Sequence, residues 1–563
     1  MGLHDPPRVP TLSAQPERAV RFGPGPLALL GLAVAAATAW RVPLALQRNY
    51  DPDEFQHLHG AYCAVRGLVA YRDYFEHHPP GCAWLLAPLV EHFGESWRTV
   101  QAARGVAFMA ALGVLMATVA LGRRTVGLGP ALLAALFLAA TPLFVDKTLE
   151  VRPDGPAALL WLLGLLGFVH GGRRAAVAGG LALGLGLMFT PKLAFGALGA
   201  VLAIALTCRR SGCAGELPRL ARFTAAAFVP LALVLAALAL RGAAGAFVRD
   251  VVVGPLGWPR ELSPWRFSAE LARGSPALVG LGLLGLGHFT LGSPGPGRCG
   301  AARSAPGHGA PPDADRDRAR RCVAGAAAGF LVGWFTVPVP WPQFLVPLLP
   351  LVALGAAHTL TELAAAVAAR RPRGADALAC GALVGVAAVA ALAVRGFAGD
   401  RRLALVYAAL VAASAAPWVA ALARGRSAAG VRLTLAAAAL ALAVPLYRVV
   451  DRIRWRDTAV RQEFAALHAH TGPDDTVLSG WSAPTMFRPH AYRYFFLHPG
   501  MLAALDAEAK GPAVLRILRE QPPAIVVRDD ATRGLSAEVN AYLDAHYHPL
   551  GVGVLWQRQA AGD

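Results

Sequence analysis

PGPLALLGLAVAAATAWRVPLALQRNYDPDEFQH, residues 24–57, begins as an apolar run and ends in an acidic segment. The apolar part, residues 24–46, is long enough to cross a bilayer as a helix, which needs about 20 residues. Similar apolar stretches recur as far as residue 447, whereas a secreted protein has a single short one at its start. We therefore interpret 24–46 as a first membrane span and not as a cleaved signal.

The composition also indicates a membrane protein. Hydrophobic residues make up 55% of the 563 positions and charged residues 16%, and the mean hydropathy is +0.46, values that are hard to reconcile with a soluble fold of this size. The formal net charge of +18 comes mostly from Arg clusters between apolar stretches, which are typical of loops facing an anionic leaflet. Because no basic stripe is interleaved with aromatic residues, we expect no nucleic-acid partner.

Apolar windows broken at charge clusters predict about 13 transmembrane helices. They cover 24–46, 100–121, 127–145, 155–171, 175–190, 193–208, 223–240, 275–292, 323–336, 345–362, 376–394, 403–422 and 429–447. If residues 1–23 are a cytoplasmic tail, every second loop carries an Arg cluster, for example Arg123/Arg124 and Arg173/Arg174. This is the positive-inside pattern. It places the acidic and aromatic loops on the outer face.

Three further parts can be distinguished. Two of them lie within the helical region 24–447, and the third follows it. Residues 49–101 form an acidic first outer loop, and the Gly-, Pro- and Arg-rich stretch 293–322 predicts a flexible cytoplasmic linker. Residues 448–563 have the composition of a soluble domain, with strand-like runs at 476–479, 492–497, 524–527 and 551–557. The predicted fold is an α-helical polytopic membrane protein with a small extracytoplasmic C-terminal α/β domain. The Arg- and Ala-rich composition suggests a bacterial inner membrane.

Two carboxylates of the first outer loop, Asp53 and Glu54, admit two interpretations. Asp51 is a good helix N-cap, Pro52 suits the first helical position, and acidic residues are favoured in a first turn. A helix start therefore explains Asp51 and Glu54 without chemistry. However, Asp53, Glu54 and His57 also lie at spacings that share one helix face, so the same residues could form a catalytic site. The Asp51-Pro52-Asp53 pattern also resembles a nucleotide-sugar metal clamp, which an outer location argues against.

A second segment of this loop, Tyr71-Arg72-Asp73-Tyr74-Phe75-Glu76-His77-His78-Pro79-Pro80, concentrates titratable groups beside the membrane. Imidazoles and carboxylates are ligands of divalent metals. His57, His59, His77 and His78 with Glu76 or Asp53 could therefore bind such a metal, although their spacing matches no metal motif. We expect no required cofactor.

Three later loops carry candidate residues. Glu150-Val151-Arg152-Pro153-Asp154-Gly155-Pro156 offers Arg152 and Asp154, where Asp154 could instead cap the following helix. Lys192, in Thr190-Pro191-Lys192, lies between apolar spans and needs a partner or a snorkelling path. Arg260, in the aromatic-rich segment 257–265, could add positive charge, while its tryptophans suit a membrane interface equally well.

Together these motifs resemble the GT-C glycosyltransferases of the protein mannosyltransferase and aminoarabinose transferase group. The resemblance covers roughly residues 30–350. It implies a polyprenyl-phosphate sugar donor, an outer-face site and inversion at the anomeric carbon. By the same resemblance, Asp53 would orient or activate the acceptor, Asp154 would be a second acidic residue, and Lys192 would contact phosphate. Glu76-His77-His78-Pro79-Pro80 stands where the aminoarabinose branch has Glu-Lys-Pro-Pro, which leaves open whether Glu76 or His77 takes the Glu role.

The residue types suit that chemistry. Phosphate is a tolerable leaving group, so a fixed Lys or Arg can stabilise the charge that develops on it. A carboxylate whose pKa is raised by desolvation can accept the proton of the incoming hydroxyl. We expect Asp53, Glu54 and Asp154 to be catalytic and Glu76, His77, His78, Arg152, Lys192 and Arg260 to bind substrate. The expected partners are the polyprenyl-phosphate sugar, membrane lipids and an envelope acceptor, which is lipid A, a glycan, another lipid or a protein.

Two other classes of function fit part of the pattern. A polytopic transporter or lipid flippase would have many apolar spans, but transporters generally place ionisable groups near the bilayer midplane. Here the charges lie at span ends. A non-catalytic scaffold would not explain the acidic and histidine-rich loop.

Overall fold

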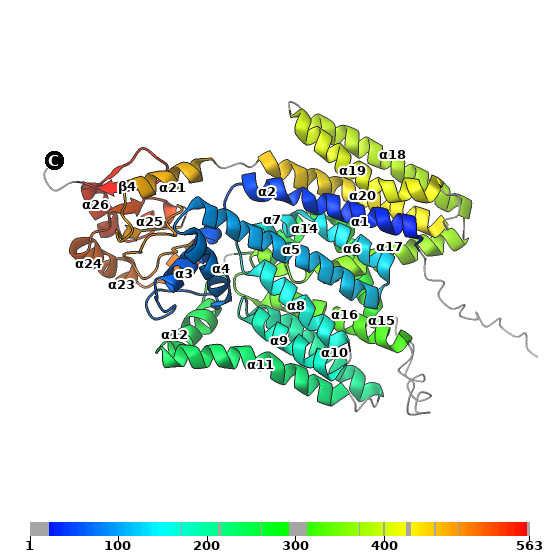
Figure 1. Cartoon of the computed structure of the whole chain (residues 1–563), viewed down its shortest axis with the longest axis horizontal. Helices are drawn as coiled ribbons and strands as arrows, with labels where there is room; N and C mark the ends of the chain where they lie inside the picture. Colours follow the sequence, from blue (N-terminus) through cyan, green and yellow to red (C-terminus); the bar gives the residue numbers. More distant parts are fainter. Residues whose placement is uncertain are drawn as a thin grey trace, which may run out of the picture.

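The computed structural model describes residues 22–170, 172–211, 216–260, 262–291, 312–370, 372–397, 400–423, 429–454, 458–481 and 483–559. Long helices form a bundle, and the C-terminal region lies at one end of it (Figure 1). The predicted N-terminal tail up to residue 21, and residues 293–311 of the predicted linker, lie outside the described residues. The rest of that linker is helical, because a helix begins at Pro312.

The long helices follow the order of the predicted apolar stretches. Their bounds are α1 (Pro24–Ala39), α2 (Arg41–Gln47), α5 (Trp97–Thr125), α6 (Leu128–Ala139), α7 (Pro142–Leu149), α8 (Asp154–Val169), α9 (Arg173–Leu187), α10 (Leu193–Ser211), α11 (Glu216–Leu240), α15 (Pro276–Leu291), α16 (Pro312–Thr336), α17 (Leu349–Arg370), α18 (Pro372–Gly396), α19 (Arg401–Ala423) and α20 (Ala429–Asp451). Shorter helices connect them: α3 (Pro52–Val65), α4 (Gly81–Phe93), α12 (Ala244–Phe247), the π-helix η1 (Val248–Val253), α13 (Gly254–Leu256), α14 (Pro264–Gly274) and the 3₁₀ helix η3 (Pro342–Leu345).

Six spans within the described residues are long and apolar enough to cross a membrane, namely α1 with α2, α5, α11, α17, α19 and α20. The pair α6 and α7 adds a seventh if it is counted as one broken span. Four shorter apolar helices of 10–17 residues lie within α8, α10, α15 and α18. The chain is therefore a multi-pass membrane protein, while the number of 13 spans stays a prediction.

The predicted span over 127–145 consists of two helices, because α6 and α7 meet at 68°. Pro142 occupies the first turn of α7, and Thr141 before it is extended, with φ −75° and ψ 118°. Proline lacks the N–H of the helix ladder and disfavours helical geometry in the preceding residue. The break lets α7 carry Asp146 and Lys147 in a direction different from that of α6.

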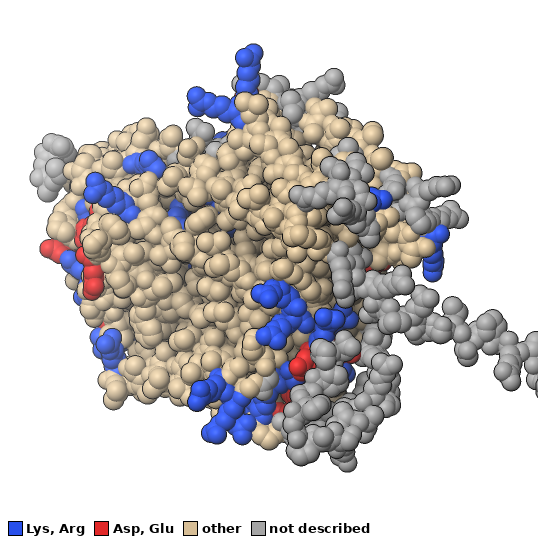
Figure 2. Space-filling model, turned by 45° about the vertical axis from the view of Figure 1, so that its right-hand side comes forward, with Lys and Arg blue, Asp and Glu red and all other residues tan. Residues whose placement is uncertain are grey.

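Contacts between charged residues show that predicted inner loops meet at one end of the bundle. Arg124 Nη2, at the end of α5, lies 3.1 Å from His170 Nε2, which follows α8. Arg318 of α16 donates to the Val169 carbonyl (2.9 Å) and pairs with Glu216 at the start of α11 (3.1 Å). On the face shown in Figure 2, Lys and Arg gather in groups around a broad area of other residues. The loops group as predicted, and the side of the membrane on which each group lies stays a prediction.

Glycines allow several helix pairs to approach closely. A Cβ at Gly199 of α10 would lie 2.1 Å from the Gly325 carbonyl oxygen of α16, and one at Gly285 of α15 would lie 2.1 Å from the Gly355 oxygen of α17. Helices in membranes associate through such small-residue contacts because lipid provides no hydrophobic drive between them. These contacts fix the spacing of the helices that carry the loops.

The C-terminal region contains a four-stranded sheet in the order β1-β2-β4-β3. Its strands are β1 (Val477–Leu478), β2 (Ile525–Val527), β3 (Tyr547–Pro549) and β4 (Leu555–Arg558), with β1 parallel to β2 and the other pairs antiparallel. The helices are η4 (Arg452–Arg454), α21 (Ala459–Ala469), α22 (Pro499–Ala504), α23 (Ala507–Lys510), α24 (Pro512–Glu520), α25 (Asp530–Arg533) and α26 (Ala537–His546).

Three of the four strand predictions overlap a strand, and the run 492–497 does not. That segment has no ladder partner in the described sheet. Its residues are buried because they pack on the first loop: the Phe75 amide donates to the Arg493 carbonyl (3.1 Å), and Phe495 lies in one apolar cluster with Phe55. The aromatic character of the segment therefore reflects contact between two distant parts of the chain.

Candidate functional site

Helix α3 positions the acidic residues of the first loop. Asp51 is its N-cap: the side chain accepts the amide of Asp53 (3.0 Å), while Glu54 Oε1 accepts the amide of Asp51 (2.9 Å). This reciprocal arrangement is a capping box, with Pro52 at the first helical position. The helix-start interpretation of Asp51 and Glu54 is thus confirmed.

Glu54 faces away from the other candidate residues. Its carboxylate is fully buried, pairs with Arg104 through Nη2 (2.6 Å) and Nε (2.8 Å), and accepts the amide of Val151 (3.1 Å). Both oxygens are therefore engaged in holding α3 against α5 and the start of α8. Glu54 lines neither of the two large cavities among the described residues, and a catalytic role for it stays a prediction.

Arg152 links Asp53 to three other carboxylates. It forms an ion pair with Asp53, and its Nη1 lies 3.4 Å from both Asp51 Oδ1 and Glu150 Oε2. Its Nε lies 3.5 Å from Asp154 Oδ2. The Arg152 side chain is only 4% exposed, so these pairs are little screened by water. Two stretches about 100 residues apart in sequence thus converge on one guanidinium.

The ion pair sets the protonation of Asp53. Burial alone would raise the pKa of this carboxyl, but Arg152, assisted by His57 and Lys147, holds the pKa below its ordinary value. The prediction of a pKa raised by desolvation is therefore wrong, because the positive charges outweigh the loss of water. Asp53 is a carboxylate at neutral pH.

Lys192 and Asp154 form a second pair beside Arg152. Lys192 Nζ lies 3.8 Å from Asp154 Oδ1. Burial lowers the pKa of Lys192, and Asp154 partly opposes that effect. Asp154 lies in the first turn of α8 but makes no side-chain capping bond there, and its Oδ1 makes no hydrogen bond to any described residue. These contacts favour the site interpretation of Asp154 over the capping one.

The charged groups line one end of a cavity of about 480 Å³, which we call the main cavity. Its polar end consists of Asp51, Asp53, Gln56, Lys147, Arg152 and Lys192. Apolar residues form the other walls, among them Phe195, Val252, Leu256, Val337, Trp341 and Phe344. Trp481, Phe496 and His498 of the C-terminal region also line it. Val252, Leu256 and Trp341 are exposed, so part of the apolar lining lies at the protein surface.

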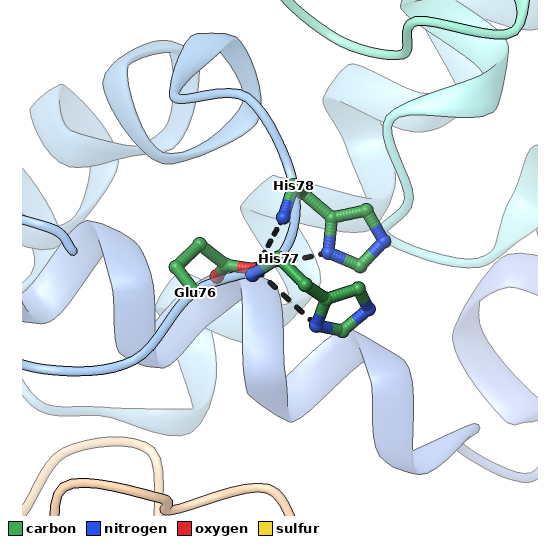
Figure 3. A group of neighbouring side chains, drawn as sticks. All are labelled: Glu76, His77 and His78. Atoms are coloured by element: carbon green, nitrogen blue, oxygen red, sulfur yellow. Dashed lines mark hydrogen bonds and ion pairs between the residues drawn. The ribbon is translucent and has the colours of Figure 1, made fainter. Parts of the chain in front are cut away.

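Glu76, His77 and His78 form a compact cluster beside this end (Figure 3). Glu76 Oε1 accepts the amides of His77 and His78 (both 2.9 Å), His78 Nδ1 (3.0 Å) and Gln56 Nε2 (3.1 Å). The carboxylate thereby fixes the loop, while the two imidazoles line the main cavity and Glu76 does not. Of the two predicted positions, His77 is the one that faces the main cavity.

The same three side chains could hold a divalent cation. Their ligand atoms lie within 4.8 Å of one another, and imidazole with carboxylate suits zinc and similar metals. Burial lowers the pKa of His77 and His78 well below the ordinary value, so both imidazoles are neutral and able to ligate. Metal binding would compete with the four hydrogen bonds that Glu76 Oε1 already accepts.

Arg260 is not brought to this site. It is exposed and does not line the main cavity, whereas its neighbour Trp258 does. The ring of Trp258 lies 5.1 Å from that of His498. Substrate binding by Arg260 therefore stays a prediction, and Trp258 is the residue of this segment that lines the main cavity.

Three further residues shape the site and were not predicted from the sequence. Lys147 lines the main cavity and lies 2.9 Å from Glu150 Oε2. Glu150 is 1% exposed and contacts Arg48, Lys147 and Arg152. His498 comes from the far end of the chain. The lysine and the three acidic residues within 146–154 were a usable signal for Lys147 and Glu150, whereas the sequence around His498 gave no such signal.

The comparisons with known proteins concern the fold. Residues 77–237 match the model of the dolichyl-phosphate-mannose-protein mannosyltransferase family. The structure superimposes on ArnT from Cupriavidus metallidurans bound to undecaprenyl phosphate, with a TM-score of 0.60 over 95% of this chain and 98% of that one, at 15% identity. The chain has a GT-C fold. The apo state of the same ArnT matches equally well, with a TM-score of 0.60 and 16% identity over 94% of this chain and 96% of that one.

A third structure shares the GT-C fold at greater distance. The Archaeoglobus fulgidus oligosaccharyltransferase tethered with an acceptor peptide has a TM-score of 0.50 and 13% identity, and the match covers 95% of this chain and 74% of that one. A comparison with curated protein sequences finds no match. The predicted resemblance to GT-C proteins is confirmed.

Proposed function

We propose that this protein is a glycosyltransferase that moves a sugar from a polyprenyl-phosphate donor to the hydroxyl of an envelope acceptor on the outer face of the membrane, with inversion. The observation that carries the proposal is the main cavity, whose lining combines two carboxylates and three cations with apolar side chains. A lipid phosphate has the same two parts, an anionic head and an apolar tail.

The lining of the main cavity offers apolar and cationic side chains for the two parts of such a donor. The exposed residues Val252, Leu256 and Trp341 belong to the apolar lining, where a prenyl chain would lie without leaving an apolar environment. Lys147, Arg152 and Lys192 receive the phosphate, because fixed cations in a partly dry site bind phosphate oxygens strongly. The GT-C fold and the undecaprenyl phosphate bound to the similar ArnT support this assignment.

The reaction follows from these positions. The bond between the anomeric carbon and the phosphate oxygen breaks, and its electrons leave with the phosphate, where Lys192 and Arg152 stabilise the charge. The acceptor oxygen bonds to the opposite face of that carbon, and its proton passes to Asp53. The low pKa of Asp53 suits a late proton transfer, because an oxygen bound to an electron-poor carbon is far more acidic than a free hydroxyl.

Donor binding would also raise the pKa of Asp53. The phosphate competes for Arg152, which is the largest cause that lowers the Asp53 pKa. As Arg152 turns toward the phosphate, the pKa of Asp53 rises and the carboxylate becomes a better base. Asp154 keeps Lys192 in place during this exchange, since its carboxylate lies 3.8 Å from the ammonium group.

An assay with a panel of undecaprenyl-phosphate sugars tests the proposal on the full-length protein in detergent or nanodiscs. We expect Asp53→Asn to lower the transfer rate by ~100-fold or more, as the loss of a general base does, and Lys192→Ala to lower it by ~100-fold, as the loss of a charge-stabilising group does. Asp474→Asn and Lys510→Ala are matched controls, because Asp474 is 84% exposed and neither residue lines the main cavity. Wild-type rates in both site variants would rule the proposal out.

A further inference from the structure

Four ring-bearing side chains form one part of the lining of the main cavity, which we call the aromatic wall. Trp481, Phe496 and His498 come from the C-terminal region, and Trp258 comes from the loop after α13. The centroid of the Phe496 ring lies 6.0 Å from that of Trp481 and 5.5 Å from that of His498. The Trp258 ring continues the series, 5.1 Å from His498. The wall therefore joins two distant parts of the chain around one side of the cavity.

The fold of the C-terminal region fixes Trp481 at one end of the sheet. Strands β1 and β2 are parallel, and Asp529, shortly after β2, accepts the amide of Trp481, shortly after β1 (2.8 Å). A Cβ at Gly480 would overlap the Asp529 carboxylate, so this contact requires glycine there. The Gly480 carbonyl accepts the amide of Leu497 (2.8 Å), which ties the two segments of the wall together. In α/β sheets, ligands bind outside the carboxyl ends of the strands, which is where Trp481 lies.

Two N–H groups of the aromatic wall are available to a ligand. His498 Nδ1 accepts the amide of Met501 (3.3 Å) at the start of α22. Burial lowers the pKa of His498 to about 4, so the ring is neutral at pH 7 and its single hydrogen is on Nε2. The indole Nε1 of Trp481 is buried and makes no hydrogen bond to any described residue. Both groups can therefore donate to an atom of a bound molecule.

These donors select the chemistry of that molecule. An indole N–H and the remaining N–H of a neutral imidazole need a partner with a lone pair. A sugar hydroxyl supplies one, and the C–H face of the sugar ring can pack on the apolar faces of aromatic rings. An ammonium group has three donors and no lone pair, so it would leave both N–H groups unpaired. Aromatic faces also attract cations, which makes an amino sugar the rival ligand.

We propose that the aromatic wall binds the sugar of the donor, and that it selects a sugar presenting hydroxyl groups there and not a free amino group. The inference rests on the proposed function and names the class of its donor. With the phosphate at Arg152 and Lys192, the sugar extends toward Trp481 and His498. Asp53 is close enough to His498 to act on its charge, so the carboxylate lies beside the anomeric carbon of a sugar held in this way.

Equilibrium binding to the full-length protein in nanodiscs tests the inference without requiring transfer. The probes are undecaprenyl phosphate and the same lipid carrying mannose, glucose, arabinose or 4-amino-4-deoxyarabinose, measured by competition with a fluorescent polyprenyl phosphate. Arabinose and its amino derivative are a matched pair. We expect at least one neutral sugar to lower the Kd about fivefold or more relative to undecaprenyl phosphate, as one or two added hydrogen bonds do. The amino sugar should not lower it.

Two substitutions remove the donors while keeping other roles of the residues. Trp481→Phe keeps a ring without an N–H, and His498→Asn keeps an oxygen that can cap α22. We expect each to weaken binding of the preferred neutral-sugar lipid about threefold or more and to leave the Kd of undecaprenyl phosphate within a factor of two. Trp556→Phe is the matched control, because Trp556 of β4 does not line the main cavity. It should bind every probe as wild type does.

Thermal melting of each variant separates misfolding from loss of contact, and Trp258→Leu, outside the C-terminal region, replaces a variant that does not fold. Three results would overturn the inference: neutral-sugar lipids that bind no tighter than undecaprenyl phosphate, an amino-sugar lipid that binds as tightly as the best neutral one, or unchanged affinity in the folded variants. Each of these leaves the proposed function in place. Failure of wild type to bind undecaprenyl phosphate itself would instead contradict the proposed function.

Discussion

Glu150 holds two of the cations of the main cavity in position. Its side chain is 1% exposed, and it lies 3.0 Å from Arg48, 2.9 Å from Lys147 and 3.4 Å from Arg152. We expect Glu150→Gln to lower kcat/KM for the donor by ~100-fold, because small misplacements of binding groups have effects of that size. Steady-state kinetics with the undecaprenyl-phosphate sugar measure this.

Glu216→Gln is the matched control for Glu150. Glu216 also pairs with two arginines, Arg219 (2.8 Å) and Arg318 (3.1 Å), but it lies at the opposite end of the bundle. Its kcat/KM should stay within a factor of three of the wild-type value. A Glu150→Gln variant with normal melting and unchanged kcat/KM would show that the network does not position Lys147 and Arg152.

The alkaline limb of the pH profile reports on Lys192. Burial holds the pKa of Lys192 below its ordinary 10.5, so its charge is lost at a lower pH than that of a free lysine. An arginine keeps its charge throughout this range. In Lys192→Arg we therefore expect the alkaline fall of kcat/KM to move to higher pH, measured between pH 7 and pH 10.5.

Lys510→Arg, in the C-terminal region, should leave that profile unchanged. If the profiles of Lys192→Arg and wild type coincide, another group causes the alkaline fall, and the contact of Lys192 with the phosphate loses its support.

At the scale of single elements, the contact between α10 and α16 is sensitive to added volume. A Cβ at Gly199 would lie 2.1 Å from the Gly325 oxygen and 2.9 Å from Gly329 Cα. Overpacking of this kind costs about 1–3 kcal/mol, which exceeds the gain of up to about 1 kcal/mol from replacing a helical glycine with alanine. We expect Gly199→Ala to lower the melting temperature.

Gly287→Ala is the control for this contact, because a Cβ at Gly287 of α15 meets nothing within 4 Å. That variant should melt at or above the wild-type temperature in the same detergent. A Gly199→Ala variant as stable as Gly287→Ala would mean that α10 and α16 can move apart without penalty.

The elements also show what local pattern can and cannot reveal. Apolar runs predicted the positions of most long helices, and Asp51-Pro52 predicted the start of α3, because these depend on neighbours in sequence. The bend at Pro142 was not predicted, because the hydropathy of an apolar run does not reveal a change in helix direction. The aromatic segment 492–497 was predicted to be a strand, because segments buried against another part of the chain contain the same residue types as buried strands.

Part of the site could be predicted because a charged side chain next to an apolar span is energetically unfavourable unless it has a partner. Asp53, Arg152, Asp154 and Lys192 are charges next to apolar spans, and the structure brings all four together. The pairing of Glu54 with Arg104 was not predicted, because Arg104 lies inside a predicted span. The lowered pKa of Asp53 could not be foreseen, because it depends on the pairing with Arg152 across the fold.

At the scale of the whole molecule, Arg493 ties the C-terminal region to the helical part. Its guanidinium donates to the Tyr71 carbonyl (2.6 Å) and the Arg72 carbonyl (3.0 Å) and lies 3.2 Å from Asp250. Hydrogen bonds from a charged donor contribute about 1.5–3 kcal/mol. We expect Arg493→Ala to speed amide hydrogen exchange in residues 72–78 and 490–498 and to raise the donor KM.

Arg516→Ala is the matched control for Arg493, because Arg516 is 63% exposed and pairs only with Glu508 on the surface among the described residues. Exchange in 72–78 should then match wild type. Unchanged exchange in Arg493→Ala would show that apolar contacts alone hold the two parts together.

The presence of Trp481, Phe496 and His498 in the lining of the main cavity has a consequence for biosynthesis. The acidic loop and its cations leave the ribosome early, yet the last wall of the pocket is encoded more than 280 residues after Lys192. During insertion into the membrane, the half-made protein would expose its carboxylate to water without a complete chamber. On the proposed function, we expect that a chain ending before Trp481 transfers no sugar, because it lacks three lining residues of the main cavity.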